Sequence, residues 1–273
     1  MNGRVVRGED ATLSVFDRGA RDGGGIFETL RVYGGRPFAW RRHMERLVLA
    51  AAELGFPVPA APAELRGGLD ALLEAQGLTD AVVRVTVTRG VAGGRPTRAG
   101  AWVDAEPLGG RLWAGTRSGA GSAVLSRLPF EPGRLGRYKT TSRLAFDLAR
   151  EEARAAGVDE ALLVSPAGQV LEGAASNVFL VSAGEVVTPP LSLPVLPGVT
   201  RAIVLELCRE RGLRHREAAF PPAHLDSAGE AFLTNSAQEI LPLARIGDRE
   251  LPARAAGERL LAAYRERVAA GRD

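Results

Sequence analysis

Apolar and polar positions along this chain follow two different periods, and the period predicts which segments are strands and which are helices. Alternation with a period of two, bounded by turn residues, predicts short strands. These are expected over residues 3–6, 12–16, 25–33, 36–40, 81–89, 102–105, 111–128, 160–165, 169–171, 177–181, 185–188 and 230–233. Apolar residues at three- and four-residue spacing predict helices over 41–54, 63–75, 141–156, 199–211 and 255–270.

The order of these elements predicts the fold class. Strands outnumber the helices between them, and the regular strand–helix–strand alternation of a doubly wound sheet is missing. This pattern is typical of the α+β class. Small and turn-forming residues at Pro107–Gly110 predict a linker. The 273 residues are therefore expected to form a small N-terminal α+β domain over 1–108 and a larger domain over 109–273.

The composition argues against several classes of function. Hydrophobic residues make up 45% and charged residues 25% of the chain, as in soluble globular proteins. The net charge of +3 is small, and no basic run carries interleaved aromatic residues, so no nucleic-acid partner is expected. No apolar run approaches a membrane span, and the first residues lack the apolar core of a signal peptide. The single Cys208 lies in an apolar helix pattern and indicates a reducing, cytoplasmic setting.

Lys139, in the segment RYKTTSR, is the only lysine among the 35 basic residues of the chain. Arginine keeps its charge, whereas a lysine amine can lose its proton and attack a carbonyl. Schiff-base catalysis is the main chemistry that requires such an amine. A bias toward arginine could also leave one surface lysine by chance, and composition alone does not separate the two interpretations.

Two segments carry the small hydrogen-bond donors expected of a phosphate site. Gly198–Thr200, in LPGVTR, stands at a predicted helix start, where free backbone N–H groups and the helix dipole attract an anion. Thr234–Ser236, in LTNSAQE, follows a predicted strand, and Arg46 offers a forked, charge-assisted contact. A simple helix cap also explains the first segment.

Other candidate chemistry is sparse. Glu172, in VLEGAASNVF, ends a predicted strand between apolar residues. A carboxylate there is either a surface turn residue or a partly buried acceptor, and beside a pyridine ring such an acceptor can keep the ring nitrogen protonated. The glycine runs match no nucleotide-binding fingerprint. His43, His215 and His224 lie far apart without other ligands at metal-binding spacing, so no metal site is expected.

Five motifs in a fixed order give the chain a specific resemblance. They are GGGIFETLRVYGGRPFAWRRHMERL, YKTTSRLAFDLAREEA, DEALLVSPAGQVLEGAASNVFLV, PGVTR and LTNSAQEILPL, spread over residues 23–243. The sequence resembles the class IV (fold type IV) pyridoxal-phosphate-dependent enzymes. This family includes branched-chain and D-amino-acid aminotransferases and 4-amino-4-deoxychorismate lyase. The resemblance implies a two-domain α+β fold with a barrel-like C-terminal domain, pyridoxal 5'-phosphate (PLP) bound in a cleft, a small-molecule substrate and a homodimer.

The resemblance also implies roles for single residues. Lys139 would form the Schiff base with PLP and move protons, and Glu172 would hold the pyridine nitrogen. The phosphate would be bound by Arg46, Val199 (through its backbone), Thr200 and Ser236. The candidate substrate-binding residues are Phe27, Arg31, Arg89 and Arg95.

Within this family, several features favour 4-amino-4-deoxychorismate lyase, which forms 4-aminobenzoate and pyruvate. The chain is short for a branched-chain aminotransferase. Arg143 stands four residues after Lys139, and Asn235–Ser236 resembles the Asn-Ser of the lyases. The loop TRGVAGGRP resembles their Arg- and Gly-rich loop, with one extra residue before the paired glycines and Pro96 at the last glycine. The lyase is therefore the favoured expectation.

Other features keep an aminotransferase for D-amino or branched-chain amino acids, with 2-oxoglutarate or pyruvate, as the alternative. FETLR and SAQEILPL are common among class IV aminotransferases. Phe27 replaces the tyrosine usual in D-amino-acid aminotransferases, and GGRPTR does not cleanly match their Arg-x-His loop. A cofactor-binding protein without turnover is a further alternative, which the presence of both Lys139 and Glu172 opposes. An arginine-based nucleic-acid binder is another, and the lack of a stacking platform opposes it.

Overall fold

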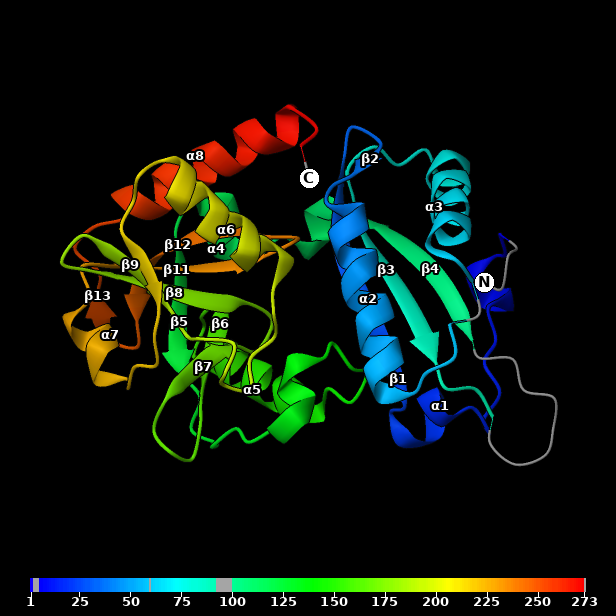
Figure 1. Cartoon of the computed structure of the whole chain (residues 1–273), viewed down its shortest axis with the longest axis horizontal. Helices are drawn as coiled ribbons and strands as arrows, with labels where there is room; N and C mark the ends of the chain where they lie inside the picture. The colour runs from blue at the N-terminus through cyan, green and yellow to red at the C-terminus, as the bar shows by residue number, and fades with distance from the viewer. Residues whose placement is uncertain (2–4, 59, 92–99, 273) are drawn as a thin grey trace. The chain divides into compact units, whose positions relative to one another are not determined.

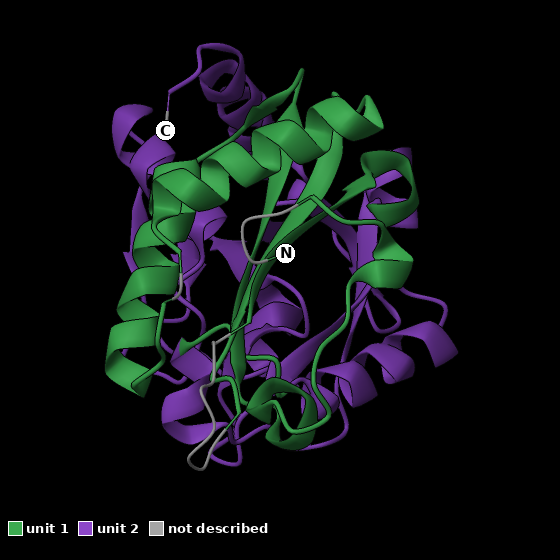
Figure 2. Ribbon diagram, turned by 90° about the vertical axis from the view of Figure 1, so that its right-hand side faces the viewer, with its two compact units in different colours: residues 1–111, 138–142, 273 green, residues 112–137, 143–272 purple. Residues whose placement is uncertain are grey.

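The computed structural model describes residues 1, 5–58, 60–91 and 100–272, which form two compact units (Figure 2). Unit 1 consists of Met1–Arg111 together with Tyr138–Ser142, here named the return segment. Unit 2 consists of Leu112–Arg137 and Arg143–Arg272. The predicted boundary at 108/109 lies just before the observed division. The prediction did not include the return segment, which brings Lys139 into unit 1.

Unit 1 is built on an antiparallel sheet of four strands in the order β2-β1-β3-β4 (Figure 1). The strands are β1 (Gly25–Tyr33), β2 (Arg36–Pro37), β3 (Ala81–Thr88) and β4 (Ala101–Pro107). The helices are α1 (Arg18–Asp22), α2 (Trp40–Leu54) and α3 (Pro62–Gln76), with 3-10 turns at Gly8–Asp10 and Leu108–Arg111. The strands predicted at 25–33, 81–89 and 102–105 and both predicted helices of this unit are confirmed.

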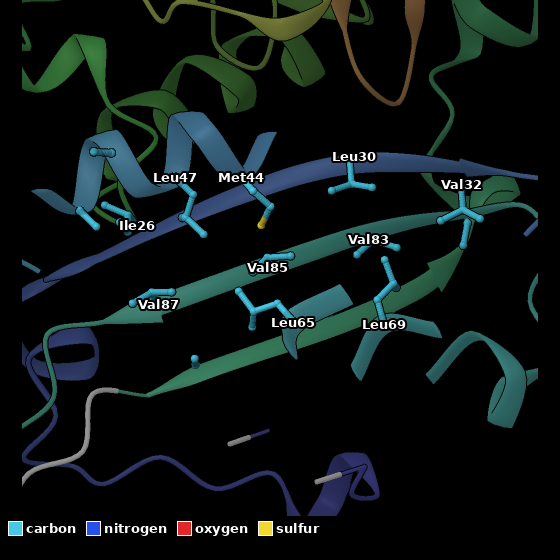
Figure 3. Close-up of a cluster of buried hydrophobic side chains, with 14 of the residues drawn as sticks. Ile26, Leu30, Val32, Met44, Leu47, Leu65, Leu69, Val83, Val85 and Val87 are labelled. Carbon is cyan, nitrogen blue, oxygen red and sulfur yellow. The ribbon is translucent and has the colours of Figure 1, made fainter. Parts of the chain in front are cut away.

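The two faces of β1 have different neighbours because successive side chains of a strand point to opposite sides. Ile26, Leu30 and Val32 belong to the buried apolar cluster that β1 and β3 form with α2 and α3 (Figure 3). Phe27 and Arg31 are therefore on the opposite face. The alternation separates these two candidate site residues from the core of unit 1.

Unit 2 contains a nine-stranded mixed sheet in the order β10-β9-β8-β11-β12-β5-β6-β7, with β13 paired to β12. Its strands are β5 (Gly121–Leu125), β6 (Glu160–Val164), β7 (Val170–Gly173), β8 (Asn177–Ser182), β9 (Glu185–Thr188), β10 (His215–Glu217), β11 (Glu230–Asn235), β12 (Glu239–Ile246) and β13 (Arg249–Glu250). Its helices are α4 (Ala114–Ser118), α5 (Leu144–Ala155), α6 (Val199–Glu210), α7 (Ala223–Ser227) and α8 (Ala255–Ala269), with a 3-10 turn at Gly133–Arg137. Helices α6 and α8 pack on each other and on β11, while α5 packs on β6.

The sheet of unit 2 curls around one apolar cluster. Val187 of β9 and Val170 of β7, from opposite ends of the sheet, lie in the same buried cluster as residues of the central strands. After β10 the chain connects these two ends. The Ala218 N–H donates to the Thr188 carbonyl (3.0 Å), and the Phe220 carbonyl accepts from the Val170 N–H (2.9 Å). The predicted α+β fold with a larger, barrel-like C-terminal part is confirmed.

Two predicted strands are wrong. Over 12–16 the side chains of Val15 and Phe16 are exposed, and the Asp17 N–H donates to the Ser14 carbonyl to form a turn. The strand predicted over 111–128 is α4 followed by β5, because Gly119, with φ of 91°, ends the helix. Of the strand predicted over 3–6, residues 5 and 6 are not in a strand, and 3 and 4 lie outside the described residues.

The prediction also missed β12, a central strand of unit 2. Its sequence EILPLARI contains Pro242, and a proline argues against a central strand because it has no N–H for the ladder. The first part of β12 is buried on both faces, so the expected apolar–polar alternation is absent.

In the described part of the chain, no helix is long and apolar enough to cross a membrane.

Leu30 and Leu49 offer a matched test of the core of unit 1. Leu30 is fully buried in the apolar cluster, whereas Leu49 on α2 is 58% exposed. Leu30→Ala is expected to lower the free energy of unfolding by about 2–5 kcal/mol, since it removes buried methyl groups and leaves a cavity. Leu49→Ala should change it by less than about 0.5 kcal/mol. Urea unfolding followed by tryptophan fluorescence measures both, and equal losses would contradict this assignment of the core.

Candidate active site

Lys139 is fixed by backbone pairing of the return segment with β1. The Phe27 N–H donates to the Lys139 carbonyl (2.8 Å), and the Thr141 N–H donates to the Gly25 carbonyl (2.9 Å). A bridge between Ile26 and Thr140 lies between these two bonds. The return segment therefore acts as a short added strand, and the backbone position of Lys139 is set by the sheet of unit 1.

The amine of Lys139 lies over an aromatic ring. Its Nζ is 4.8 Å from the centroid of the Phe27 ring, and the Lys139 side chain is half-buried. The guanidinium of Arg84 lies 3.7 Å from the same centroid. Phe27 itself is only 4% exposed, and cations are attracted to the face of such a ring. Phe27 thus contacts the candidate nucleophile directly.

Arg46 is held by a buried carboxylate of β1. Its Nε donates to Oε1 of Glu28 (2.7 Å) and its Nη2 to Oε2 (2.6 Å), while Nδ1 of His43 lies 2.7 Å from the same Oε2. Glu28 and His43 are 1% and 2% exposed. A guanidinium carries five N–H donors, so this pairing fixes the orientation of the fork without using all of them.

Glu28 and His43 have shifted pKa values. Burial raises the pKa of Glu28, but the charge of Arg46 and the hydrogen bonds from His43 and Arg46 outweigh it, and the pKa falls from 4.5 to about 2. Burial lowers the pKa of His43 below its ordinary 6.5, against the opposing effect of the Glu28 hydrogen bond. At neutral pH the cluster is a carboxylate, a guanidinium and a neutral imidazole.

The other candidate substrate residues are dispersed over unit 1. The guanidinium of Arg31 lies 4.3 Å from the centroid of the Tyr33 ring, on the same face of β1 as Phe27. Arg89 is exposed, with Nη2 donating to the Leu54 carbonyl (2.5 Å). Arg95 lies outside the described residues. The structure therefore places Arg31 on the Phe27 face and Arg89 near the end of α2.

Glu172 of unit 2 is a buried acceptor, the second of its two sequence interpretations. It stands near the end of β7 and is 4% exposed. Its Oε2 accepts from the Leu196 N–H (3.0 Å) and from Nδ2 of Asn177 (3.2 Å). These two donors are neutral, and a buried carboxylate with such partners suits a protonated ring nitrogen.

The N-terminus of α6 suits an anion. The helix begins at Val199, and its N-cap residue Gly198 provides no side-chain cap. The first helical bond is the one from the Ala202 N–H to the Gly198 carbonyl (3.0 Å), so the first-turn N–H groups have no partner within the helix. Val199 and Thr200 are buried there, where a phosphate would meet backbone donors and the positive end of the helix dipole.

Ser236 lies in the turn between β11 and β12 and is half-buried. Asn235 shapes this turn: its Oδ1 accepts from the N–H groups of Ala237 (3.0 Å) and Gln238 (2.7 Å). Its Nδ2 donates to the Ala175 carbonyl (3.0 Å), in the loop that follows Glu172. The Asn-Ser pair noted in the sequence is thus a turn tied to that loop.

These residues fit the chemical needs of PLP. The cofactor requires an amine for its aldehyde, an acceptor for its ring nitrogen and donors for its phosphate. The amine is available in Lys139, the acceptor in Glu172, and phosphate donors in Arg46 and in the N-terminus of α6. Among the described residues, no group of three or more His, Cys, Asp and Glu side chains is arranged to hold a metal ion.

Sequence analysis missed the residues that hold these groups in place. The sequence could have identified Glu28 as a buried, paired carboxylate. It occupies a core-facing position of β1 between Ile26 and Leu30, where a charge needs a buried partner. The partner role of His43 on α2 required the tertiary structure. Asn177 follows Glu172 by five residues, but only the turn between β7 and β8 brings the two side chains together.

The sequence is similar to a family of known proteins and to individual members of it. The sequence model of the family described as amino-transferase class IV matches residues 25–246. The chain is 35% identical over 266 residues to a Methanocaldococcus jannaschii protein with the provisional name branched-chain-amino-acid aminotransferase, covering 94% of this chain and 91% of that protein. It is 30% identical over 258 residues to the D-alanine aminotransferase of Bacillus licheniformis, covering 94% and 90%.

A solved structure shows the same fold. The branched-chain aminotransferase of Thermoproteus uzoniensis, crystallised with norvaline, superposes with a TM-score of 0.90 at 28% identity. The match covers 99% of this chain and 94% of that one.

The Glu28–His43–Arg46 cluster predicts acid sensitivity. The stability contributed by Glu28 is complete above a pH of about 4.5 and is lost as the pH falls toward its folded pKa of about 2. The folded state also keeps His43 neutral, so stability falls as the pH drops below 6.5 and the unfolded chain takes up the proton. His43→Asn keeps an N–H donor for Glu28 and removes this titration.

The free energy of unfolding, measured by urea between about pH 7 and pH 5, should fall for the natural chain and change much less for the variant. Parallel slopes for the two proteins would contradict the assignment of this titration to His43.

Proposed function

The chain belongs to the class IV aminotransferase family and is a PLP-dependent enzyme, and from this premise we propose that it is a transaminase of aliphatic amino acids. The preferred substrates are branched-chain L-amino acids, with 2-oxoglutarate as amino acceptor. The observation that carries the proposal is the half-buried amine of Lys139, held on β1 against the apolar ring of Phe27. The full-length similarity to a branched-chain aminotransferase supports it.

We assign cofactor binding and proton transfer to residues of this chain. When bound, PLP supplies an electron sink for the bond that breaks at the α-carbon of the substrate. Lys139 attaches the cofactor through Nζ and, once displaced by the substrate amine, takes a proton at that nitrogen and returns it. Glu172 keeps a proton on the ring nitrogen. In unit 2, the first-turn N–H groups of α6 and Ser236 bind the phosphate. The phosphate role of Arg46 stays a prediction from the resemblance.

The relatives of the chain support the aminotransferase alternative better than the lyase that the sequence analysis favoured. The curated relatives described above are aminotransferases, for branched-chain amino acids and for D-alanine. One feature that favoured the lyase has a structural explanation: Nη2 of Arg143 donates to the Ala174 carbonyl (2.7 Å), in the loop after Glu172. Most of the Arg- and Gly-rich loop lies outside the described residues. A lyase therefore remains an outcome of the test below and is no longer the favoured function.

Between the two transaminase substrates, Phe27 favours branched-chain amino acids. D-amino-acid aminotransferases usually carry a tyrosine at this position, as the resemblance implies. Here the ring has no hydroxyl, is 4% exposed and contacts both Nζ of Lys139 and the Arg84 guanidinium. An apolar surface beside the amine suits an aliphatic side chain. Arg31, on the same strand face, is the candidate for the substrate carboxylate.

We also propose a homodimer, as the resemblance implies, and light scattering of the purified protein tests it. A mass near twice the 28.8 kDa of the chain is expected. The cytoplasmic setting stays a prediction from the single Cys208, whose pKa burial raises to about 11, as expected for a thiol that does no chemistry.

Lys139 should be the only residue that attaches the cofactor. Borohydride treatment of the holoenzyme is expected to fix PLP on one peptide containing Lys139, since the chain has no other lysine. Lys139→Ala should abolish the adduct and lower turnover by at least about 10³-fold. Peptide mass spectrometry and a coupled assay measure the two effects. A fixed adduct on any other peptide would contradict the assignment.

The substrate is decided by three parallel assays with the natural enzyme. L-leucine with 2-oxoglutarate is expected to give a keto acid at the highest kcat/KM. D-alanine with 2-oxoglutarate should react more slowly, because Phe27 lacks a ring hydroxyl. Aminodeoxychorismate should give no fluorescent aminobenzoate. Rapid formation of aminobenzoate and pyruvate from aminodeoxychorismate, with no keto acid formed from L-leucine or D-alanine, would restore the lyase. A reaction with D-alanine alone would assign a D-amino-acid transaminase.

A further inference from the structure

Three hydrogen bonds form a closed ring between β7, β8 and the chain that leads into α6. Nδ2 of Asn177 donates to Oε2 of Glu172 (3.2 Å) and to the Leu196 carbonyl (3.0 Å). The Leu196 N–H donates to the same Oε2 (3.0 Å). Asn177 is 6% exposed and Glu172 is 4% exposed, so water competes little for these bonds. The ring joins the carboxylate to the segment that positions the helix start.

Among neutral side chains, only a primary amide satisfies both acceptors from one atom. The NH₂ group of asparagine carries two hydrogens, one for the carboxylate and one for the carbonyl. Because both neighbours of Nδ2 are acceptors, the network also fixes which end of the amide is nitrogen. Aspartate offers no second donor there and would place a negative charge beside Glu172. Serine carries a single hydrogen on a shorter side chain.

The other end of the amide contacts the N-cap of α6. A Cβ added to Gly198 would lie 1.9 Å from Oδ1 of Asn177 and 3.2 Å from Cβ of Arg201. The backbone of Gly198 is extended, with φ of −65° and ψ of 136°, so the constraint is space and not conformation. Asn177 is thus packed between the carboxylate of Glu172 and Gly198, the N-cap residue of α6.

We propose that Asn177 is a positioning residue that couples Glu172 to the N-terminus of α6 and so sets the spacing of the two groups that unit 2 offers to PLP. The inference rests on the cofactor roles proposed above for Glu172 and α6. It predicts that Asn177 acts on cofactor binding through Glu172 and helix placement, without being a ligand itself. Loss of Asn177 should therefore resemble loss of Glu172.

Thr234 provides a matched control on the neighbouring strand. It belongs to the segment Thr234–Ser236 named in the sequence analysis, but the phosphate role proposed above is assigned to Ser236 and not to Thr234. It is paired with Asn177 in the register of β8 and β11 and is 1% exposed. Its Oγ1 has no hydrogen-bond partner among the described residues. Thr234→Val keeps the shape of the side chain and removes no hydrogen bond of the ring. This variant therefore shows how much a substitution at a buried position beside Asn177 changes PLP affinity when the hydrogen-bonded ring is intact.

The experiment measures PLP affinity of the apoenzyme by fluorescence titration for four variants. These are Glu172→Gln, Asn177→Ala, the double variant of both, and Thr234→Val. Glu172→Gln and Asn177→Ala are each expected to raise the dissociation constant by roughly 10- to 100-fold, as for loss of a hydrogen bond to a buried charge. The double variant should be little worse than either single variant, because both act on one unit. Thr234→Val should stay within about 3-fold of the natural chain.

The absorption spectrum of bound PLP, recorded against pH, separates positioning from general destabilisation. The pH-dependent band should shift in the same direction in Glu172→Gln and Asn177→Ala and stay unchanged in Thr234→Val. If Asn177→Ala does not fold, Gly198→Ala tests the same coupling with Asn177 present, because the added methyl group displaces the amide. It should reproduce the spectral shift.

The outcomes separate the inference from the function on which it rests. If Glu172→Gln leaves PLP affinity and spectrum unchanged, the cofactor role of Glu172 is wrong. If Glu172→Gln weakens binding but Asn177→Ala does not, or if the two effects are fully additive, Asn177 does not act through Glu172 and the inference is overturned. An equal loss in Thr234→Val would overturn it as well, since any buried change would then have the same effect.

Discussion

The placement of Lys139 depends on the backbone hydrogen bonds between the return segment and β1. The return segment interrupts the part of the sequence that forms unit 2. It pairs with β1, a strand more than a hundred residues earlier in the chain, through the hydrogen bonds of the Phe27 and Thr141 N–H groups. These two backbone bonds, on either side of the bridge between Ile26 and Thr140, set the register of the segment against β1. The candidate nucleophile therefore has a position on the sheet of unit 1, although the segments on either side of 138–142 in the sequence belong to unit 2.

Buried charge is the second constraint, and the fold satisfies it in the same way in both units. Glu28 receives donors from Arg46 and His43, and Glu172 receives them from Asn177 and the backbone. Glu160, for which burial raises the pKa, accepts from the backbone of the Gly173–Ser176 loop and from the hydroxyl of Ser176. A buried carboxylate without such donors would cost several kcal/mol, roughly, so each one orders the residues around it. In unit 2 these residues form the loop between Glu172 and Asn177.

The sequence was sufficient to predict the periodic strands and helices and the residues that carry candidate chemistry. It was insufficient to predict the hydrogen-bond partners that hold those residues in place. Strand 25–33 and helix 199–211 have clear periods, and the structure has them within one residue. β12 was missed because burial on both faces removes the alternation on which strand prediction depends. Lys139 and Glu172 were identified from residue type and motif. Their partners depend on contacts between distant segments, and residue type alone carries little of that information.

The arginine-rich composition explains less about Lys139 than its structural position does. At Arg201, Nη2 donates both to the Pro189 carbonyl (2.8 Å) and to Glu217 (2.6 Å), and Arg249 donates from its two terminal nitrogens to the carbonyls of Leu225 and Ala228 (2.8 Å each). The contact of Arg249 is a fork of two nitrogens that a lysine ammonium could not reproduce, so arginine is required there, whereas Arg201 serves both of its acceptors from one nitrogen. Exposed pairs such as Arg41 with Glu45 carry no such requirement, and a lysine would serve equally well. The absence of lysine from those positions reflects composition, and a single lysine by itself proves nothing. What distinguishes Lys139 is that its backbone is paired to a buried strand and its amine is held against an aromatic ring, an arrangement that a surface charge does not need.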